Sequence, residues 1–398
     1  MQTSINISPE EFNTRADYLL QYLKESNLNG VVLFDSFYIL YYCGFAFIPT
    51  ERPIAFIMNN KGEKGLFVPR LEVEHAKANA IIERVNHYIE YPHAPRPMQI
   101  FKKMLNEMGI KGNIGADNDG YPWILGYSGP TLTELTGNHP SRVSIFIEVQ
   151  MMIKSKSELA LIRESVKWGH LAHVLLQRYT KVNASETEVS ARASMEANLA
   201  MLDTIGPIYR SSSPFSRGAG AGYRGQIGRN SAIPHALANN ITFQVGDVLV
   251  TGAGAPIWGY NSELERTMII GPATKEQKSM FDHMVTLQDI AFESIKPGLP
   301  CAEVDKAVRA YYEKHDLMKY WKHHVGHAIG LRYHEAPFLD IGDETIMQPG
   351  MVFTVEPGLY HPQLGGFRHS DTVAVTEEGI EILTYYPRDL QSLTLPPH

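Results

Sequence analysis

The 398-residue sequence is poor in cysteine and has neither a long apolar run nor a block of positive charge. Its two cysteines, Cys43 and Cys301, form no metal-binding pattern, and we expect a reducing, cytoplasmic setting. The formal net charge of -7 at pH 7 argues against a nucleic-acid partner. The longest apolar stretch, residues 37–49, is too short to cross a membrane. The first residues lack the basic and apolar segments of a secretory signal.

Hydrophobic residues make up 44% of the chain and charged residues 20%, as is typical of a globular protein that buries a sizeable core. A chain of this length predicts two domains, which we place at residues 1–153 and 154–398. The first domain alternates a helix with strands, predicted at residues 9–26, 29–35, 54–60 and 62–69. This pattern is typical of a small α/β domain.

The second part of the chain repeats pairs of helices separated by strands. Ser157 is the predicted N-cap of a long amphipathic helix that opens it. Further helices are predicted at residues 186–203, 275–296 and 301–316, and strands within 241–271 and 351–384. The order of helix pair, strands, helix pair and strands is typical of an α+β domain with an internal duplication.

Two glutamates lie close together in the segment GYNSELERT, residues 259–267. Because Glu263 and Glu265 are two positions apart in a predicted strand, both side chains leave the same face. Like charges at that distance raise each other's pKa unless a cation lies between them. The alternative for two isolated glutamates is a solvated outer face.

Histidines are concentrated in HHVGHAIGLRYHEAP, residues 323–337. Gly326 and Gly330 allow the backbone to approach a ligand closely. Neutral imidazole binds metals and moves protons near pH 7, which makes His327 and His334 candidates for chemistry. Any one of these histidines taken alone is more often a hydrogen-bonded structural residue.

Two more stretches carry polar groups in positions suited to a site. Glu356 follows the apolar run MVFTV, and a buried carboxylate there must be paired, be coordinated or shift its pKa. The alternative for Glu356 is a cap on the turn at Pro357–Gly358. His235 lies in the polar loop of residues 230–240. We expect these four stretches to assemble one site.

Together these stretches resemble the successive active-site motifs of the creatinase/prolidase (pita-bread) family, in the right order and across nearly the whole chain. The segments that carry the resemblance are GDVLV…GY…ERT, HVGHAIGL…HEAP and VEPG. The resemblance implies an α+β pita-bread C-terminal domain preceded by a smaller α/β domain. It also implies a homodimer that acts on a small molecule.

The metallopeptidases of this family hold two metal ions with five side chains. The resemblance places three of those positions at Glu263, His327 and Glu356, and the other two at Gly252 and Ser370. Glycine and serine cannot supply the carboxylates that bridge two cations. The resemblance therefore implies a site rebuilt without its metal and without any other cofactor. The sequence leaves open whether one weakly bound metal is retained at Glu263, His327 and Glu356.

Within the family, the overall resemblance is greatest to the ectoine hydrolases. It implies metal-independent opening of the cyclic amidine ring of ectoine to N-acetyl-diaminobutyrate, a step of osmolyte catabolism. Two alternatives stay open: creatinase-like hydrolysis of another amidine or guanidine, and an Xaa-Pro metallopeptidase. A binding module without activity is a further alternative, which the aligned histidines and glutamates disfavour.

Similarity to creatinase implies roles for individual residues. Glu265 and Glu356 pair with the amidinium, and His235 shuttles the proton. Arg52, in the N-terminal domain, reaches the partner subunit's site and binds the substrate carboxylate, with Arg332 as the alternative.

The remaining candidates are His327 and Glu263 as catalytic groups, and Tyr260 and His334 as substrate contacts. A glutamate, either Glu263 or Glu265, attacks directly as a nucleophile, or it serves only as a charge partner. The sequence leaves these two mechanisms open.

Overall fold

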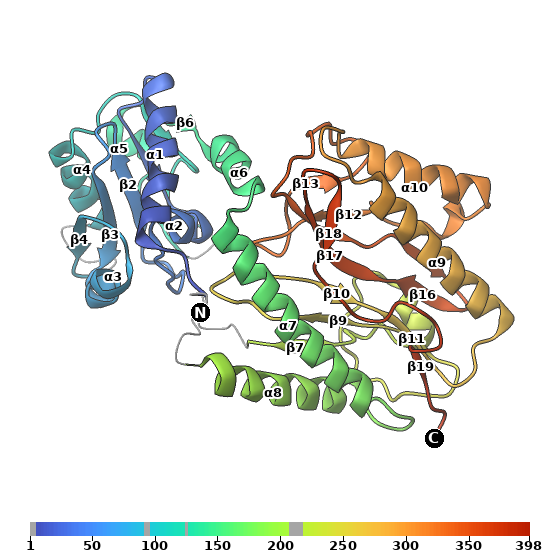
Figure 1. Cartoon of the computed structure of the whole chain (residues 1–398). Helices are drawn as coiled ribbons and strands as arrows, with labels where there is room; N and C mark the ends of the chain where they lie inside the picture. The colour runs from blue at the N-terminus through green and yellow to red at the C-terminus, as the bar shows by residue number, and fades with distance from the viewer. Residues whose placement is uncertain (1–4, 91–95, 124–125, 207–217) are drawn as a thin grey trace. The chain divides into compact units, whose positions relative to one another are not determined.

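The computed structural model describes residues 5–90, 96–123, 126–206 and 218–398 (Figure 1). Two compact units divide the chain, one of residues 6–151 and one that takes in the described residues from 152 onward. Among the described residues, no helix has the length and apolar composition needed to cross a membrane. In the described part of the chain, the N-terminal unit holds the six-stranded sheet and the C-terminal unit holds the eight-, three- and two-stranded sheets.

The N-terminal unit is built on one mixed sheet with the strand order β4-β3-β2-β1-β5-β6. Its strands are β1 (Gly30–Leu33), β2 (Ala55–Asn59), β3 (Lys64–Pro69), β4 (Arg84–Tyr88), β5 (Ile114–Ala116) and β6 (Ser141–Arg142). β2 and β3 pair antiparallel, so the hairpin predicted at residues 54–60 and 62–69 is confirmed. β1 and β5 run parallel, which brings their carboxyl ends to one edge of the sheet.

Six α-helices accompany this sheet among the described residues. They are α1 (Pro9–Glu25), α2 (Ser36–Cys43), α3 (Val73–Asn79), α4 (Pro97–Glu107), α5 (Leu132–Thr136) and α6 (Ser144–Met152). Of these, α3 and α4 contact strands of the sheet. α4 buries Phe101 and Met104 in a cluster with Val32 and Phe67 of the sheet. The rings of Phe67 and Phe101 lie 4.9 Å apart between centroids. The apolar stretch of residues 37–49 is largely buried here, in and after α2.

The C-terminal unit follows the predicted order of helix pair, strands, helix pair and strands. Its helices are α7 (Lys156–Tyr179), α8 (Glu186–Ile205), α9 (Lys275–Ser294) and α10 (Ala302–Lys314). Its strands are β7 (Gly220–Gly222), β8 (Val248–Val250), β9 (Gly252–Gly254), β10 (Leu264–Glu265), β11 (Thr267–Ile270), β12 (Gly326–Ala328), β13 (Glu335–Leu339), β14 (Val352–Val355), β15 (Gly358–His361), β16 (Gly365–Arg368), β17 (Ser370–Val375), β18 (Ile380–Ile382) and β19 (Thr394–Leu395).

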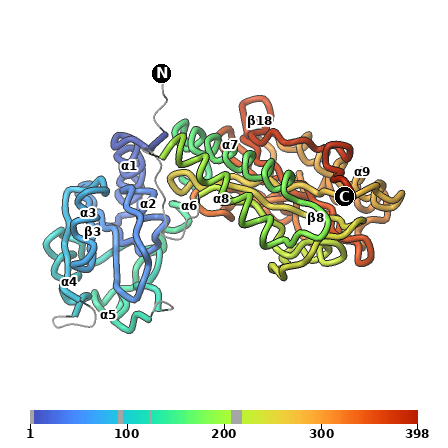
Figure 2. Tube along the Cα trace, turned by 90° about the horizontal axis from the view of Figure 1, so that it is seen from below, coloured from blue at the N-terminus to red at the C-terminus, as the bar shows by residue number. Residues whose placement is uncertain are grey.

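The main sheet of this unit has the order β13-β12-β14-β17-β10-β9-β7, with β18 also paired to β17. α7 and α8 lie side by side in both views and contact β7 (Figures 1 and 2). α9 and α10 pack on each other, α9 against β14 and β16 and α10 against β13. The sheet order brings chain segments from residues 252, 263, 327, 356 and 370 onto neighbouring strands.

The start of α7 differs from the prediction by two residues. Its N-cap is Ser155, not Ser157: the Ser155 hydroxyl accepts from the backbone N–H of Glu158, and the Glu158 side chain accepts from the backbone N–H of Ser155. This reciprocal pair satisfies two otherwise unpaired N–H groups, which a cap at Ser157 does not.

Ser155→Ala is expected to lower the free energy of unfolding by about 1 kcal/mol, because one of these N–H groups loses its acceptor. Ser157→Ala is the matched control, since Ser157 lies inside the first turn of α7. Chemical denaturation of both variants checks this. An equal loss in the two would contradict the assignment of the cap.

Candidate metal and catalytic site

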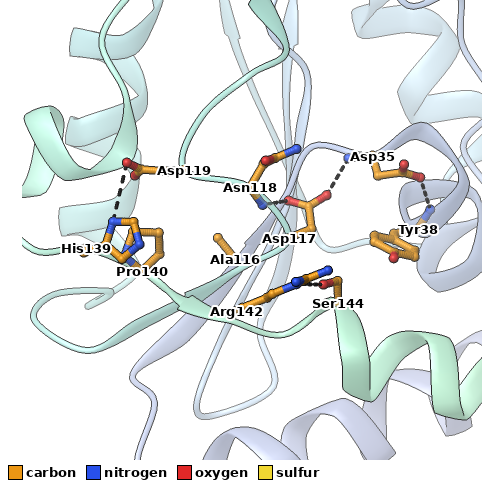
Figure 3. Close-up of a pocket in the computed structure, with 10 residues that line it drawn as sticks. All are labelled: Asp35, Tyr38, Ala116, Asp117, Asn118, Asp119, His139, Pro140, Arg142 and Ser144. Atoms are coloured by element: carbon orange, nitrogen blue, oxygen red, sulfur yellow. Dashed lines mark hydrogen bonds and ion pairs between the residues drawn. The ribbon is translucent and has the colours of Figure 1, made fainter.

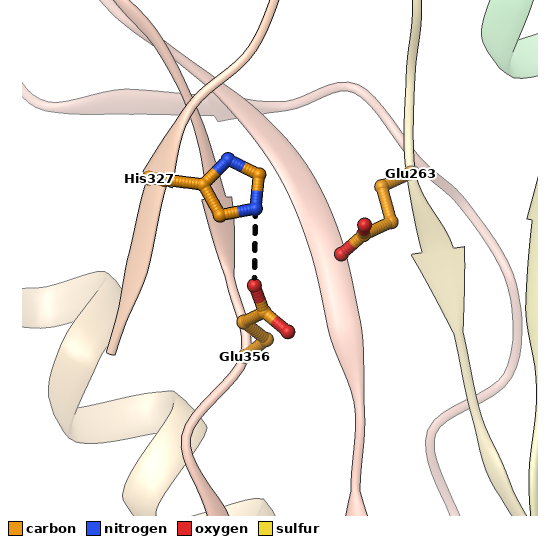
Figure 4. Close-up of side chains that lie close together, drawn as sticks. All are labelled: Glu263, His327 and Glu356. Carbon is orange, nitrogen blue, oxygen red and sulfur yellow. Dashed lines mark ion pairs between the residues drawn. The ribbon is translucent and has the colours of Figure 1, made fainter. Parts of the chain in front are cut away.

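Three acidic or imidazole side chains converge in the C-terminal unit (Figure 4). One donor atom each from Glu263, His327 and Glu356 lies within 4.8 Å of the other two. Glu263 immediately precedes β10, His327 lies in β12, and Glu356 immediately follows β14. The structure therefore brings together three of the five residues predicted as catalytic.

The sheet register explains this convergence. β14 and β17 pair so that Val355 faces Asp371, and Asp371 also faces Leu264 of β10. Residues next to these partners, at 263 and 356, are thereby placed on one side of the sheet. β12 pairs with β14 on its other side, which carries His327 to the same place.

His327 is held in one orientation by its backbone. Its Nδ1 lies 2.9 Å from the carbonyl of Ala328, and because a carbonyl only accepts, Nδ1 carries the proton. Its Nε2 lies 3.3 Å from Oε1 of Glu356, without the alignment of a hydrogen bond. Burial by itself lowers the pKa of His327, but the charges of Glu356 and Glu263 outweigh it and raise the pKa to about 9.

The pKa values of the two carboxyl groups in the cluster are shifted in opposite directions. Burial, followed by the charges of Glu356 and Glu265, raises the pKa of Glu263 to about 8. Burial also acts to raise the pKa of Glu356, but His327 and the charge of Arg368 prevail and hold it well below its usual range. Near neutral pH, Glu263 is therefore protonated, whereas Glu356 and His327 form an ion pair.

Glu265 does not join this cluster as a free carboxylate. Arg368 donates to it from both Nε and Nη2, the second at 2.9 Å, and both side chains are 3% exposed. Arg224 donates to the same carboxylate at 2.8 Å from its Nη2. Arg368 also reaches the hydroxyl of Tyr360, which lies 2.6 Å from Nε2 of His323. Glu265 is thus balanced by two guanidinium groups.

The two positions that lack a metal-binding carboxylate both lie opposite Glu265. Ser370 is its partner across β10 and β17, and β9 brings Gly252 alongside on the other edge. A Cβ at Gly252 would lie 3.5 Å from Oε1 of Glu265 and 3.9 Å from Nη2 of Arg224. The Ser370 hydroxyl donates to Glu263 at 2.6 Å. Glu265 therefore lies between Ser370 on one neighbouring strand and Gly252, which has no side chain, on the other.

These contacts decide whether the residues suit two metal ions or one. A pair of ions does not fit, because the guanidinium groups of Arg224 and Arg368 already compensate the carboxylate beside the missing ligands. A single divalent ion fits at Glu263, His327 and Glu356, since two carboxylates and one imidazole are ordinary ligands and Nε2 of His327 has no hydrogen-bond partner among the described residues.

A buried ion pair and two hydrogen bonds fix the loop that carries Arg332 and His334. Lys154 and Glu335 form a buried ion pair of 2.7 Å, and the backbone N–H of Arg332 donates to Glu335. The side chain of Asn261 donates to the carbonyl of Gly330 in the same loop. The ring of His334 then stacks on His327 with centroids 3.8 Å apart. His334 therefore lies directly against the cluster.

The other predicted site residues are placed as follows. His235 is exposed, and a positive charge on it acts to lower the pKa of His334, less strongly than burial and the charge of His327 do. Tyr260 is buried, and its hydroxyl donates to Glu158 of α7 instead of the cluster. Arg52 lies in the N-terminal unit, paired with Glu51 and Glu90.

Sequence reasoning missed two residues of the site, Arg224 and Arg368. One signal was available for Arg368: it lies two positions before Ser370, so in an extended chain it shares that residue's face. No comparable signal marks Arg224, because an arginine in a Gly-rich segment usually points to solvent.

A separate pocket of about 520 Å³ lies in the N-terminal unit, where β1 and β5 end (Figure 3). Its carboxylates hold backbone in place. Asp117 accepts from the backbone N–H groups of Phe34 and Asp35, and Asp35 accepts from those of Phe37 and Tyr38 at the start of α2. These contacts build the loops at this edge and assemble no catalytic group.

Comparison with known families decides the relationship of the chain. Residues 160–377, more than half of it, match metallopeptidase family M24. The chain belongs to this family. Residues 15–126 match the creatinase/prolidase N-terminal domain.

Individual relatives align along nearly the full length. The Xaa-Pro dipeptidase of Pyrococcus horikoshii is 28% identical over 384 residues, which cover 95% of this chain and 99% of the relative. The crystal structure of the prolidase from Pyrococcus horikoshii OT3 has a TM-score of 0.80 at 26% identity, covering 95% and 99% of the two chains. The Xaa-Pro dipeptidase from Bacillus anthracis has a TM-score of 0.81 at 25% identity, covering 98% and 100%.

These comparisons confirm the predicted fold, a pita-bread C-terminal domain with a smaller α/β domain before it. They contradict the predicted function. Full-length relatives of the chain include Xaa-Pro dipeptidases, and the family is one of metallopeptidases, so metal-independent opening of ectoine is the wrong conclusion. Gly252 and Ser370 supply no carboxylate, but Glu263, His327 and Glu356 converge.

Proposed function

We propose that this M24 chain hydrolyses the C–N bond of a small dipeptide of the Xaa-Pro type at the site of Glu263, His327 and Glu356. The observation that carries the proposal is the convergence of these three donors within 4.8 Å. Full-length similarity to Xaa-Pro dipeptidases supports the class of substrate.

One divalent ion would be held by Glu263, His327 and Glu356, and when bound it polarises the scissile carbonyl and acidifies a water molecule. Glu263 must first release its proton, and Glu356 must exchange its ion pair with His327 for the ion. His334, whose pKa is lowered first by burial and then by His327, is neutral near pH 7. In this proposal, His334 and the exposed His235 move a proton at the departing nitrogen.

Metal affinity is expected to rise with pH. In the metal-free protein, Glu263 and His327 are protonated below their pKa values of about 8 and about 9. A bound ion displaces both protons, so affinity should increase up to about 100-fold per pH unit below pH 8. Mn²⁺ titrations at pH 6 and pH 7 against a chelating dye check this. Glu263→Gln should reduce the dependence to about tenfold, and a flat dependence in wild type would contradict the protonation states.

The proposed activity is tested with a substrate panel. Chelator-treated protein, with and without added Mn²⁺, is incubated with Ala-Pro, Ala-Ala, creatine and ectoine, and products are followed by mass spectrometry. Cleavage of Ala-Pro only with metal is the expected outcome. Turnover of creatine or ectoine by the metal-stripped protein, with Ala-Pro left intact, would overturn the proposal.

A second candidate is creatinase-like hydrolysis of a guanidine or amidine. The observation that favours it is the replacement of two carboxylates at Gly252 and Ser370. Against it, Glu265, the residue matched to guanidinium binding in creatinase, already carries two arginines. The same panel separates the two candidates.

We also propose that the chain acts as a homodimer in which Arg52 of one subunit reaches the active site of the other. Mixed dimers of Arg52→Ala and His327→Gln subunits should then recover activity, because one intact site forms. Heterodimers that form but remain inactive would exclude a shared site.

A further inference from the structure

A cavity of about 370 Å³ opens at Glu265, beside the cluster of Glu263, His327 and Glu356. Glycine and alanine residues of β7 and β9 make one wall, and Arg224, Glu265, Asn261 and Tyr333 line the rest. Its volume falls in the range of small-molecule sites. Because the wall of β7 and β9 carries almost no side chains, the cavity has room for a ligand of roughly dipeptide size.

Gly252 keeps this space open. A side chain at position 252 would start 3.5 Å from Glu265 and 3.9 Å from Arg224, the two charged groups of the cavity. Any longer side chain at this position would therefore occupy the cavity.

Two guanidinium groups share the carboxylate of Glu265. Arg368 contacts it in a bidentate manner, with both side chains 3% exposed, and Nε of Arg368 also lies 3.7 Å from Oε2 of Glu356. Arg224 adds the second guanidinium, and of the two arginines it is the one whose positive charge is half exposed.

Arg224 also presents that charge to the cavity. Its side chain is 50% exposed, and only its Nη2 is engaged, with Glu265 and Gln226. Nη1 and Nε have no hydrogen-bond partner among the described residues. The guanidinium is therefore held through Nη2 alone, and its other N–H donors are available to a planar anion.

We propose that Arg224 binds the carboxylate of the substrate in this cavity. The inference rests on the proposed function for the identity of the substrate, an Xaa-Pro dipeptide whose terminal carboxylate suits a guanidinium. It gives the cavity at Gly252 a role in specificity, and it assigns Arg224, a residue that the sequence did not single out, to substrate binding. Glu265 then serves as a positioning residue that orients Arg224.

Binding of L-proline and L-prolinamide to the metal-loaded protein tests this, because neither is turned over and the two differ only in the carboxylate. Isothermal titration calorimetry is run on wild type, Arg224→Met, Arg224→Lys and Arg163→Met. Arg163 is the matched control, an exposed arginine in an ion pair with Glu381. Arg224→Met should weaken L-proline about 10- to 100-fold, leave L-prolinamide unchanged and be partly rescued by lysine.

A further variant tests the place of binding. Gly252→Val fills the cavity and should weaken both compounds, whereas Arg163→Met should weaken neither. An equal effect of Arg224→Met on both compounds, or no preference for the carboxylate in wild type, would overturn the inference. Failure to cleave Ala-Pro while these binding results hold would count against the proposed function alone.

Discussion

His327→Gln is expected to lower kcat/KM on Ala-Pro by on the order of 1000-fold, a loss of roughly 4 kcal/mol in transition-state stabilisation. His327 supplies the one nitrogen donor of the cluster, and glutamine offers only a weakly bound amide in its place. The substitution also removes the cation that holds the pKa of Glu356 low. Metal affinity and turnover should therefore fall together.

His283→Gln is the matched control. His283 lies in α9, outside the cluster, and its Nδ1 lies 2.9 Å from the hydroxyl of Tyr311. It should retain near wild-type kcat/KM. Steady-state kinetics and Mn²⁺ affinity are measured on both variants. Wild-type turnover in His327→Gln would remove this cluster from the chemistry.

Arg368→Gln should be among the most destabilising single changes in the site. It leaves the buried carboxylate of Glu265 with only the half-exposed Arg224, and breaking a buried pair costs about 3–5 kcal/mol. We expect the lower end of this range, because Arg224 still compensates part of the charge. The double variant Arg368→Gln/Glu265→Gln should regain most of the loss, since no buried charge then lacks a partner.

Urea denaturation of the two single variants and the double variant measures this coupling. Arg163→Gln provides the comparison, because its ion pair with Glu381 is nearly half exposed on both sides and is worth less than about 1 kcal/mol. Additive losses in the double variant would show that the Arg368–Glu265 pair does not balance charge as described.

Much of the fold followed from local sequence patterns. The alternation of helix and strand around residues 29–69 predicted β1, β2 and β3, and amphipathic spacing predicted α7 to α10. The cap of α7 was misplaced by two residues because two serines, Ser155 and Ser157, compete in the sequence. Only Ser155 has a glutamate three positions later, and this spacing decides the cap.

The site was predictable in part. The motifs that contain Glu263, His327 and Glu356 predicted that these residues lie in one site, and their donor atoms do converge. The partners of Glu265 were not predictable, because they depend on how β10 pairs with β17 and on an arginine from residue 224. The functional error had another origin: the carboxylates missing at Gly252 and Ser370 were given more weight than the three donors that remain.

Metal content is the most direct test of the account. Purified protein is stripped with a chelator, reloaded with Mn²⁺, freed of excess ion and analysed for metal per chain alongside Ala-Pro hydrolysis. The account predicts one ion per chain, lost in His327→Gln, with activity that follows occupancy. Two ions per chain, or full hydrolysis with none, would contradict a one-metal site at Glu263, His327 and Glu356.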